Sequence, residues 1–286
     1  MNLTDYSEIK DLLLRHGFRF SKSLGQNFLT ASWVPEQIAD SACLDEHTCC
    51  LEIGPGIGCL TEQLSRRAGK VISIELDKAL MPILAETLTG CENTEVIFAD
   101  ALKTDLRKLV AEDFAGYTPV VCANLPYNVT SPVLTKLVQS ELFESITVMI
   151  QREVAKRICA GPGEDDYSAF GIMVQWYMNT EILFDVPPSC FVPQPKVTSS
   201  VIRLTRREKR PAEVQNEELM FALIRAAFNQ RRKTLANALV SGIKEMDKEK
   251  AEAAIAECGF DVKIRGEMLS ISDFARLSDI ISLKNA

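Results

Sequence analysis

The stretch Cys50-Leu51-Glu52-Ile53-Gly54-Pro55-Gly56-Ile57-Gly58 sets the architecture expected for this 286-residue chain. Its first four residues are typical of a buried strand, which runs directly into a glycine-rich turn. A helical pattern, Leu60-Thr61-Glu62-Gln63-Leu64, follows the turn. A strand, such a turn and a helix form a nucleotide-binding βα unit, in which glycine lets the backbone approach a ligand closely. We therefore predict an α/β fold with a ligand site at this turn.

The glycine spacing narrows the class of ligand. Glu52 leads a Glu-x-Gly-x-Gly-x-Gly pattern. This pattern differs from the Gly-x-Gly-x-x-Gly of dinucleotide-binding proteins and from the phosphate loop with its Lys-Ser/Thr. An acidic lead residue suits a cationic cofactor without phosphates, such as S-adenosylmethionine. A purely structural loop is the alternative for a glycine-rich turn that stands alone.

An acid or an amide ends each of four predicted strands, at Glu52, Glu75, Asp100 and Asn124. Ligands of open α/β sheets bind at the carboxyl ends of the strands. Glu75 suits ribose hydroxyls better than Asp77, which lies further into the loop, and Asp100 suits an adenine amine. A helix cap or a solvated loop would explain one such acid, but capping alone does not readily explain four.

The strand Val120-Val121-Cys122-Ala123 leads into Asn124-Leu125-Pro126-Tyr127. The Asn124 side-chain oxygen and a nearby carbonyl, such as that of Leu125, can accept hydrogen bonds from a planar amine. Pro126 fixes the turn, and Tyr127 offers a ring for stacking a nucleobase. The tetrapeptide suits methylation of an exocyclic base amine. The alternative is a strand-ending turn whose tyrosine caps the core.

Further motifs make the chain resemble the ribosomal RNA adenine dimethyltransferases over nearly its whole length. Six segments occur in the family's order: 22–29 (KSLGQNFL), 51–61, 124–128 (NLPYN), 191–197 (FVPQPKV), 228–235 (FNQRRKTL) and 265–270 (RGEMLS). The resemblance implies a Rossmann-like S-adenosylmethionine-dependent methyltransferase sheet with a small all-helical C-terminal domain. It also implies dimethylation of two adjacent adenosines near the 3′ end of 16S rRNA in the small ribosomal subunit.

The resemblance also assigns roles to individual positions. It implies that cofactor contacts come from Asn27, Leu29, Gly54, Gly56, Glu75, Asp100 and Asn124. It implies that the target base meets Asn124, Leu125 and Tyr127, with Phe191 as the opposing stacking ring. Core packing is the alternative for Phe191, although its proline-rich loop favours a functional position.

The basic stretch from Arg206 to Pro211 indicates a domain boundary. We expect residues 1–206 to form the cofactor-binding catalytic domain, with an N-terminal extension that folds over the cofactor site. Residues 207–286 are expected to form a helical domain that binds RNA or the ribosome. The helices predicted there are 217–228, 231–241, 248–258 and 272–282.

The net charge of −7 counts against a nucleic-acid-binding protein, but the distribution of charge matters more than its sum. From Lys196 to Lys233 the chain has ten basic and four acidic residues. The expected RNA-binding residues are Arg203, Arg206, Arg207, Arg231, Arg232 and Lys233. A solvated charged face is the alternative.

Composition excludes several classes. Nine scattered cysteines without a Cys-x-x-Cys motif indicate reduced thiols and a cytoplasmic location. Only two histidines, His16 and His47, occur, so we expect neither a metal site nor histidine-based catalysis. No run of about 18 apolar residues or secretory signal occurs, so no membrane association is expected. Nothing in the sequence signals self-association, which favours a monomer.

Three alternatives remain open at this point. A related methyltransferase that acts on large-subunit rRNA shares the first-domain motifs, although the Phe191 loop and the segment 230–233 favour the small-subunit family. A ribosome-assembly factor would need the same basic surface. A nicotinamide-dependent oxidoreductase would fit the α/β pattern but not the glycine spacing.

Overall fold

The computed structural model describes residues 1–21 and 24–285, so Lys22 and Ser23 of the first motif lie outside the described residues. Contacts divide the chain into two compact units. Unit 1 is Met1–Ala155 with Met178–Arg206, and unit 2 is Lys156–Tyr177 with Arg207–Ala286. The expected boundary after Arg206 falls at the last of the three points where the chain passes between the units. Residues 156–177, expected in the first domain, make their contacts with the C-terminal helices.

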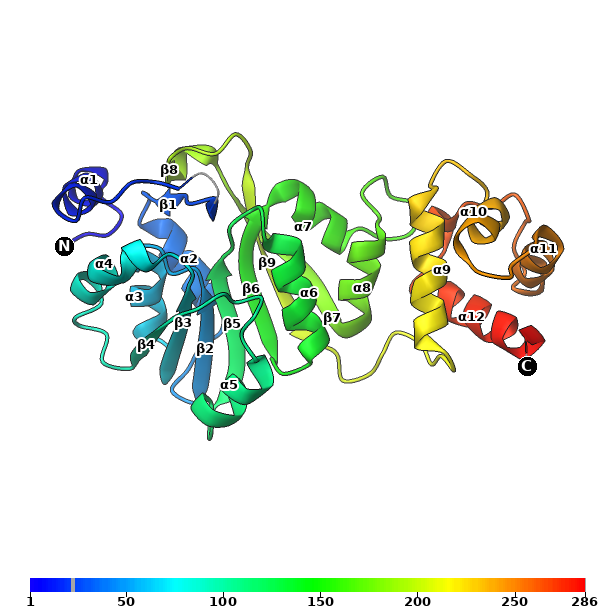
Figure 1. Ribbon diagram of the computed structural model, residues 1–286, viewed down its shortest axis with the longest axis horizontal. Coiled ribbons are helices and arrows are strands. Elements are labelled where there is room, and N and C mark those ends of the chain that lie inside the picture. Colours follow the sequence, from blue (N-terminus) through cyan, green and yellow to red (C-terminus); the bar gives the residue numbers. More distant parts are fainter. Residues whose placement is uncertain (22–23, 286) are drawn as a thin grey trace. The chain divides into compact units, whose positions relative to one another are not determined.

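Unit 1 is built on a seven-stranded sheet with the order β4-β3-β2-β5-β6-β9-β7 (Figure 1). The five strands from β4 to β6 are parallel, and β9 and β7 add an antiparallel edge. The strands are β2 (Thr48–Ile53), β3 (Lys70–Glu75), β4 (Thr94–Phe98), β5 (Thr118–Asn124), β6 (Ser145–Gln151), β7 (Met178–Val186) and β9 (Ser199–Arg206). The reversal of strand order beside β2 is the position at which doubly wound sheets bind ligands.

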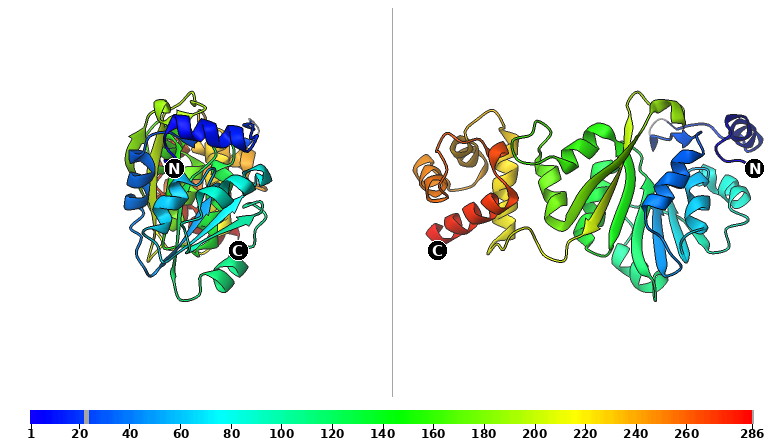
Figure 2. Two further views of the ribbon diagram at one scale, coloured as in Figure 1. Left: turned by 90° about the vertical axis from the view of Figure 1, so that its left-hand side faces the viewer. Right: turned by 180° about the vertical axis from the view of Figure 1, so that it is seen from behind.

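Helices lie on both faces of this sheet (Figures 1 and 2). They are α2 (Trp33–Ser41), α3 (Cys59–Ser65), α4 (Met81–Thr87), α5 (Leu106–Asp113) and α6 (Thr130–Ser140), with short 3₁₀ turns at Lys78–Leu80 and Pro188–Cys190. A further helix, α7 (Arg152–Cys159), begins in unit 1 and ends in unit 2. Because both faces are covered, every residue of β2 is buried, including the carboxyl of Glu52. The predicted α/β methyltransferase-type sheet is confirmed.

The N-terminal extension contains a helix that the sequence analysis did not identify, α1 (Tyr6–Arg15). The Asp5 carboxylate caps it by accepting hydrogen bonds from the amides of Ser7 and Glu8. The buried residues Ile9, Leu12 and Leu13 recur at helical spacing. They join the main hydrophobic cluster of unit 1, so the extension is an integral part of that core.

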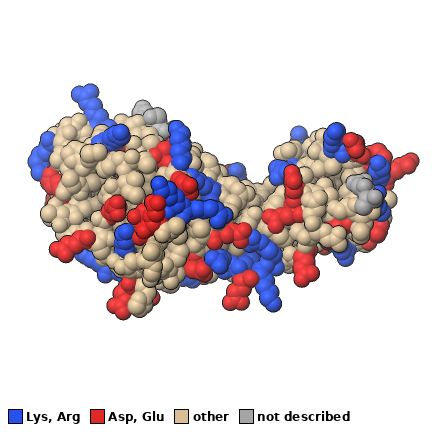
Figure 3. Space-filling view, turned by 60° about the horizontal axis from the view of Figure 1, so that its bottom comes forward, with Lys and Arg blue, Asp and Glu red and all other residues tan. Residues whose placement is uncertain are grey.

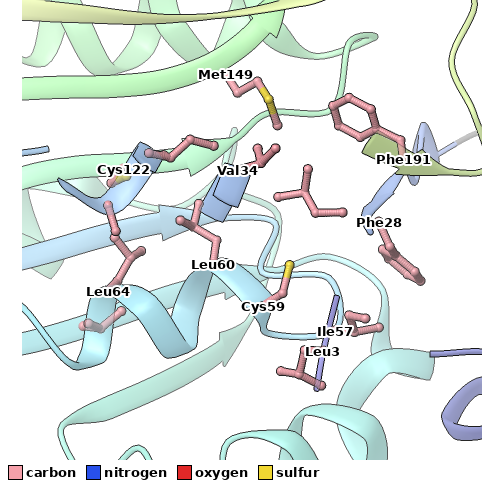
Figure 4. Close-up of a cluster of buried hydrophobic side chains, with 14 of the residues drawn as sticks. Leu3, Phe28, Val34, Ile57, Cys59, Leu60, Leu64, Cys122, Met149 and Phe191 are labelled. Atoms are coloured by element: carbon pink, nitrogen blue, oxygen red, sulfur yellow. The ribbon is translucent and has the colours of Figure 1, made fainter. Parts of the chain in front are cut away.

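A two-stranded ribbon joins the extension to the proline-rich loop: β1 (Phe28–Leu29) pairs antiparallel with β8 (Phe191–Val192). Phe28 and Phe191 are buried with residues of α2, α3 and β6 in the cluster that Figure 4 shows. Hydrophobic burial therefore holds the segment around Phe28 against the loop that carries Phe191.

Unit 2 is helical. Its helices are α8 (Ala169–Tyr177), α9 (Glu217–Asn229), α10 (Leu235–Gly242), α11 (Lys248–Glu257) and α12 (Ile271–Asn285), with a 3₁₀ turn at Gly266–Met268. The helix predicted at 231–241 begins only at Leu235, so the prediction was wrong for residues 231–234. Arg231 instead pairs with Glu267 and donates to the Asp165 carbonyl, which holds residues before Leu235 in a turn. No helix among the described residues is long and apolar enough to cross a membrane.

Candidate active site

A pocket of about 290 Å³ opens in unit 1 at the carboxyl ends of the parallel strands. The structure brings together here every residue that the sequence analysis assigned to the cofactor or the target base: Asn27, Leu29, Gly54, Gly56, Glu75, Asp100, Asn124, Leu125, Tyr127 and Phe191. These residues come from the extension, from the ends of four strands and from the proline-rich loop. Their convergence follows from the parallel register of the strands.

The charges that line the pocket have one sign. Glu52, Glu75 and Asp100 line it, and no Lys, Arg or His does so among the described residues. A ligand with phosphate groups would meet carboxylates without a compensating cation. The carboxylates that line the pocket therefore favour a cationic ligand and argue against a nicotinamide dinucleotide.

The segment Leu24–Leu29 forms one wall of the pocket. Gly25 has φ +65°, and a Cβ there would lie 2.9 Å from Asn128 Oδ1, so a side chain at this position would strain the backbone and displace Asn128. The Asn27 side chain donates to the Gly25 carbonyl at 3.0 Å, and Gln26 Nε2 donates to Asp77 Oδ2 at 2.7 Å. These contacts fix the extension against the edge of the sheet.

The glycine-rich turn lies beneath this segment. Gly56 has φ +60°, and a Cβ there would approach the Phe28 ring to 3.2 Å. Its amide donates to Glu75 Oε2 at 3.4 Å. Glycine at this position thus allows the close approach of Phe28 and links the turn to the carboxylate at the end of β3.

Glu75, rather than Asp77, faces the pocket. Both Asp77 oxygens are engaged, one by Gln26 and the other by the Ala79 amide. Glu75 is buried and accepts from the Asp77 amide at 2.7 Å, and its pKa is raised chiefly because burial disfavours the charged form. Glu75 lines the pocket whereas Asp77 does not, so Glu75, which also accepts from the Gly56 amide, is the acid at the end of β3 that can meet a ligand.

Asp100 lies in a loop that Lys136 of α6 holds in place. Asp100 Oδ1 accepts from the Leu102 amide at 2.9 Å. Lys136 Nζ donates to the carbonyls of Ala101 at 3.0 Å and Leu102 at 2.8 Å, and also to that of Thr104. The sequence analysis missed Lys136 because no local pattern relates a helix lysine to a loop more than 30 residues upstream.

The turn after β5 presents unengaged acceptors to the pocket. The Pro126 carbonyl already accepts from the Val129 amide and the Thr130 hydroxyl. In the described part of the chain, no group donates to the Leu125 carbonyl, and the Asn124 side chain makes no hydrogen bond. The Leu125 amide, by contrast, donates to the Met149 carbonyl at 3.1 Å and anchors the turn to β6.

Two aromatic side chains border these acceptors. The Tyr127 hydroxyl lies 2.6 Å from Ser199 Oγ, which fixes the ring from its far end, and burial raises the pKa of Tyr127. Phe191 lines the pocket and also packs into the hydrophobic cluster, with 5% of its surface exposed. Phe191 therefore packs in the core, as the alternative held (Figure 4). It also lines the pocket, where its ring can stack on a base.

Glu52 lines the pocket as well, although the sequence analysis did not place it among the cofactor contacts. Its Oε2 accepts from the hydroxyls of Thr61 and Ser73, both at 2.7 Å. Burial is the main cause that raises the pKa of Glu52 to about 7, and the two hydroxyl donors oppose it. Its position at the head of the glycine motif had already indicated an acid that suits a cationic cofactor.

The six basic residues expected to bind RNA have different environments. Arg203 pairs with Glu181 at 2.8 Å and Arg206 with Glu144 at 3.1 Å. Arg203 is the register partner of Thr147 in the first half of β6, and the Arg206 amide donates to the Glu144 carbonyl just before β6, so both residues lie at the end of the sheet opposite to the pocket. Arg207 donates to the Gln175 carbonyl at 2.8 Å. Acidic side chains are interspersed with basic ones over the face in Figure 3.

The Arg231 guanidinium is paired with Glu267, whereas the two basic side chains that follow it are not paired with any described acid. Arg232 and Lys233 are exposed and form no ion pair with a described residue. They are therefore the members of the expected RNA-binding set whose charge is most available to an external phosphate.

Metal and thiol chemistry find no support in the described residues. No group of three or more His, Cys, Asp or Glu side chains is arranged to hold a metal there. None of the nine cysteines, all of which are described, forms a disulfide bond, and burial raises the pKa of Cys59, which lines the pocket, to about 12. This thiol stays protonated near neutral pH and is a poor nucleophile.

The sheet order, the glycine turn and the acid-lined pocket define a Rossmann-like protein of the methyltransferase class. The sequence profile of the family described as "Ribosomal RNA adenine dimethylase" matches residues 17–282. The chain belongs to this family.

Similar curated proteins carry one name. A "Ribosomal RNA small subunit methyltransferase A" of Alkaliphilus metalliredigens is 46% identical over 279 residues, which covers 97% of each chain. A protein of the same name from Clostridium perfringens is 47% identical over 283 residues and covers 97% of this chain and 98% of its own.

Two solved structures share the fold. A dimethyladenosine transferase from Plasmodium falciparum aligns with a TM-score of 0.71 and 26% identity, covering 87% of this chain and 95% of its own. The 23S rRNA methyltransferase ErmE aligns with a TM-score of 0.68 and 26% identity, covering 89% and 99%. The fold is thus shared by a protein named as a dimethyladenosine transferase and by one named as a 23S rRNA methyltransferase.

The Glu52 carboxyl makes stability depend on pH. Because its pKa is raised from 4.5 to about 7 in the folded chain, its contribution to stability is full below about pH 4.5 and is lost as pH rises through 7. Glu52→Gln, which retains an acceptor for both hydroxyls, should therefore be more stable than the parent at pH 8, by up to about 3 kcal/mol, and similar at pH 5. Denaturant unfolding at both pH values measures this difference. The control Glu112→Gln changes an exposed acid, and an equal difference for both variants would contradict the assignment.

Lys136→Met should loosen the loop after β4. The variant keeps the apolar stem but leaves three carbonyls without their charged donor, which should cost about 2 kcal/mol of unfolding free energy. Hydrogen exchange of the amides at 101–104 should accelerate. Lys108→Met, which changes an exposed lysine of α5, is the control. Unchanged exchange at 101–104 would show that Lys136 does not hold the loop.

Proposed function

We propose that this chain transfers methyl groups from S-adenosylmethionine to the N6 amines of two adjacent adenosines near the 3′ end of 16S rRNA, within the small ribosomal subunit or its precursor. The observation that carries the proposal is the pair of unengaged acceptors at Asn124 and Leu125 inside an acid-lined pocket. Family membership and the names of the relatives support it.

The carboxylates that line the pocket suit this cofactor, because they can accept its hydrogen bonds and face its positive charge. Glu75 would accept hydrogen bonds from the ribose hydroxyls, and Asp100 would accept one from the adenine amine. Glu52 Oε2 is occupied by two hydroxyls, which leaves Oε1 to face the positive charge of the methionine part. The cofactor supplies an electrophilic methyl group, and the protein supplies the site and its charge.

The chain's contribution to the reaction would be to activate and position the amine. An exocyclic adenine amine is a weak nucleophile because its lone pair is conjugated with the ring. Hydrogen bonds to Asn124 Oδ1 and the Leu125 carbonyl would favour a pyramidal nitrogen and would stabilise the positive charge that develops on it. The rigid turn, anchored at Met149 and fixed by Pro126, holds both acceptors in place before the substrate arrives.

The target adenine must leave its stack to reach these acceptors. Tyr127, fixed by Ser199, and Phe191, fixed by the β1–β8 ribbon, would then sandwich the base. Each adenosine accepts two methyl groups, so the same pocket must also admit a monomethylated amine.

The comparisons favour small-subunit rRNA over large-subunit rRNA as the substrate. The small-subunit relatives are 46–47% identical over nearly the full chain, whereas ErmE is 26% identical. A role in subunit biogenesis, action as a monomer and a cytoplasmic location belong to the same proposal. The assembly-factor alternative would require that a variant without transferase activity still supports maturation of the subunit.

Asn124→Ala should lower the rate of methyl transfer at least about 100-fold, because it removes one of two acceptors for the developing charge. Cofactor affinity, measured by calorimetry, should change far less than turnover. Asn179→Ala alters an exposed strand residue and is the matched control. Full activity in Asn124→Ala would refute the proposed role of this residue.

Arg232→Gln combined with Lys233→Gln should weaken binding to small-subunit RNA and reduce the slope of log affinity against log salt by about 1.5. Arg203→Gln serves as the comparison because the Arg203 guanidinium is already paired with Glu181. Binding is measured at several salt concentrations. A larger loss of RNA affinity and a larger change in the salt slope for Arg203→Gln than for the double variant would contradict this assignment.

A further inference from the structure

A second hollow, of about 190 Å³, lies on the N-terminal part of unit 1. Tyr6, Lys10 and apolar residues of α1 form one side, Phe18 and Phe20 another, and Val192 of β8 contributes as well. It is smaller than the active-site pocket of about 290 Å³. The proposed methyl transfer does not involve any of these side chains.

The hollow offers aromatic faces to solvent. Phe20 is 38% exposed and Tyr6 is 59% exposed, although both are large apolar rings. The Phe20 ring lies 5.2 Å from the ring of Phe28 and 5.8 Å from that of Phe18, measured between centroids. Its neighbours therefore support Phe20 from behind, and its exposed surface can stack against another planar group.

Basic groups accompany these rings. Lys10 lines the hollow, and Arg19 precedes Phe20 directly; both are exposed and neither forms an ion pair with a described residue. Two of the three acids near the hollow have other partners, because Asp5 caps the helix and Glu8 accepts from the Asn2 amide at 2.6 Å. The third, Asp11, is exposed and follows Lys10 in the sequence. An exposed ring beside unpaired cations is the combination that binds single-stranded nucleic acid.

The hollow adjoins the active site through the β1–β8 ribbon. Phe191 lines the active-site pocket and the next residue, Val192, lines the hollow. Successive side chains of a strand point to opposite faces, so the two cavities lie on opposite sides of this ribbon. Phe28 also belongs to both surroundings, because it lines the pocket and contacts the Phe20 ring.

We propose that this hollow binds the base of a nucleotide next to the target adenosine, stacked on Phe20, with a backbone phosphate near Lys10 or Arg19. The proposal rests on the proposed function, since it extends the binding of the same RNA strand. Its size suits a single base, and its position would hold the strand on one side of the ribbon while the target base enters the other.

The test uses full-length protein and a 3′-terminal fragment of 16S rRNA with 2-aminopurine, a fluorescent base, at either neighbour of the target adenosine. At one of these positions, binding to the parent protein should quench the fluorescence through stacking. Phe20→Ala should abolish this quenching and weaken RNA affinity about 10-fold. Phe20→Trp should retain both, and Tyr117→Ala, an exposed tyrosine at the opposite edge of the sheet, should change neither.

Cofactor binding by Phe20→Ala verifies that the variant is folded. Quenching and RNA affinity that survive in this variant would overturn the proposal. Unchanged affinity for the fragment with weaker binding to whole subunits would also overturn it, in favour of a protein partner. If the parent protein transfers no methyl group to small subunits, the proposed function itself fails, and this outcome is distinct from loss of quenching in the variant.

Discussion

The structure depends on the parallel alignment of β2, β3, β4 and β5, whose carboxyl ends meet at one edge of the sheet. Parallel register brings Glu52, Glu75, Asp100 and Asn124, which are up to 72 positions apart in the sequence, to a single pocket. Backbone hydrogen bonds and two covered faces fix this alignment, so the site inherits the rigidity of the sheet. Helices and loops then adjust the edge: Lys136 holds the loop after β4, and Met149 anchors the turn after β5.

The carboxylates that result are a destabilising feature of the free protein. Glu52 and Glu75 are buried on the neighbouring strands β2 and β3, in a pocket that no described cation lines, and burial raises both pKa values. A ligand with positive charge would stabilise the charged form of both carboxyls. The proposed cofactor would therefore gain binding energy by offsetting unfavourable electrostatics that exist in the free protein. The N-terminal extension completes the site. Glycine at positions 25 and 56 favours its close passage over Gly56 and Asn128, because both backbones have positive φ and a Cβ would crowd Asn128 and Phe28.

Much of this could be predicted from the sequence. The strands, the glycine turn and the acids at the strand ends carry local patterns, and the ten residues assigned to the cofactor or the target base all line one pocket. Features that depend on distant contacts were not predictable. Helix α1 was not identified, Lys136 acts on a loop remote in sequence, and the turn at Arg231 exists because of Glu267. Arg203 shows the limit of counting charges, because β9 places it opposite to the pocket and Glu181 neutralises it.

The most direct test is transfer of labelled methyl groups from S-adenosylmethionine to under-methylated small ribosomal subunits, followed by digestion and nucleoside analysis. The proposed function predicts label in N6,N6-dimethyladenosine from the 3′ end of 16S rRNA. Label confined to large-subunit RNA would contradict the proposal that small-subunit rRNA is the substrate. Absence of label from both, together with tight binding to the small subunit, would contradict catalysis and would support the assembly-factor alternative.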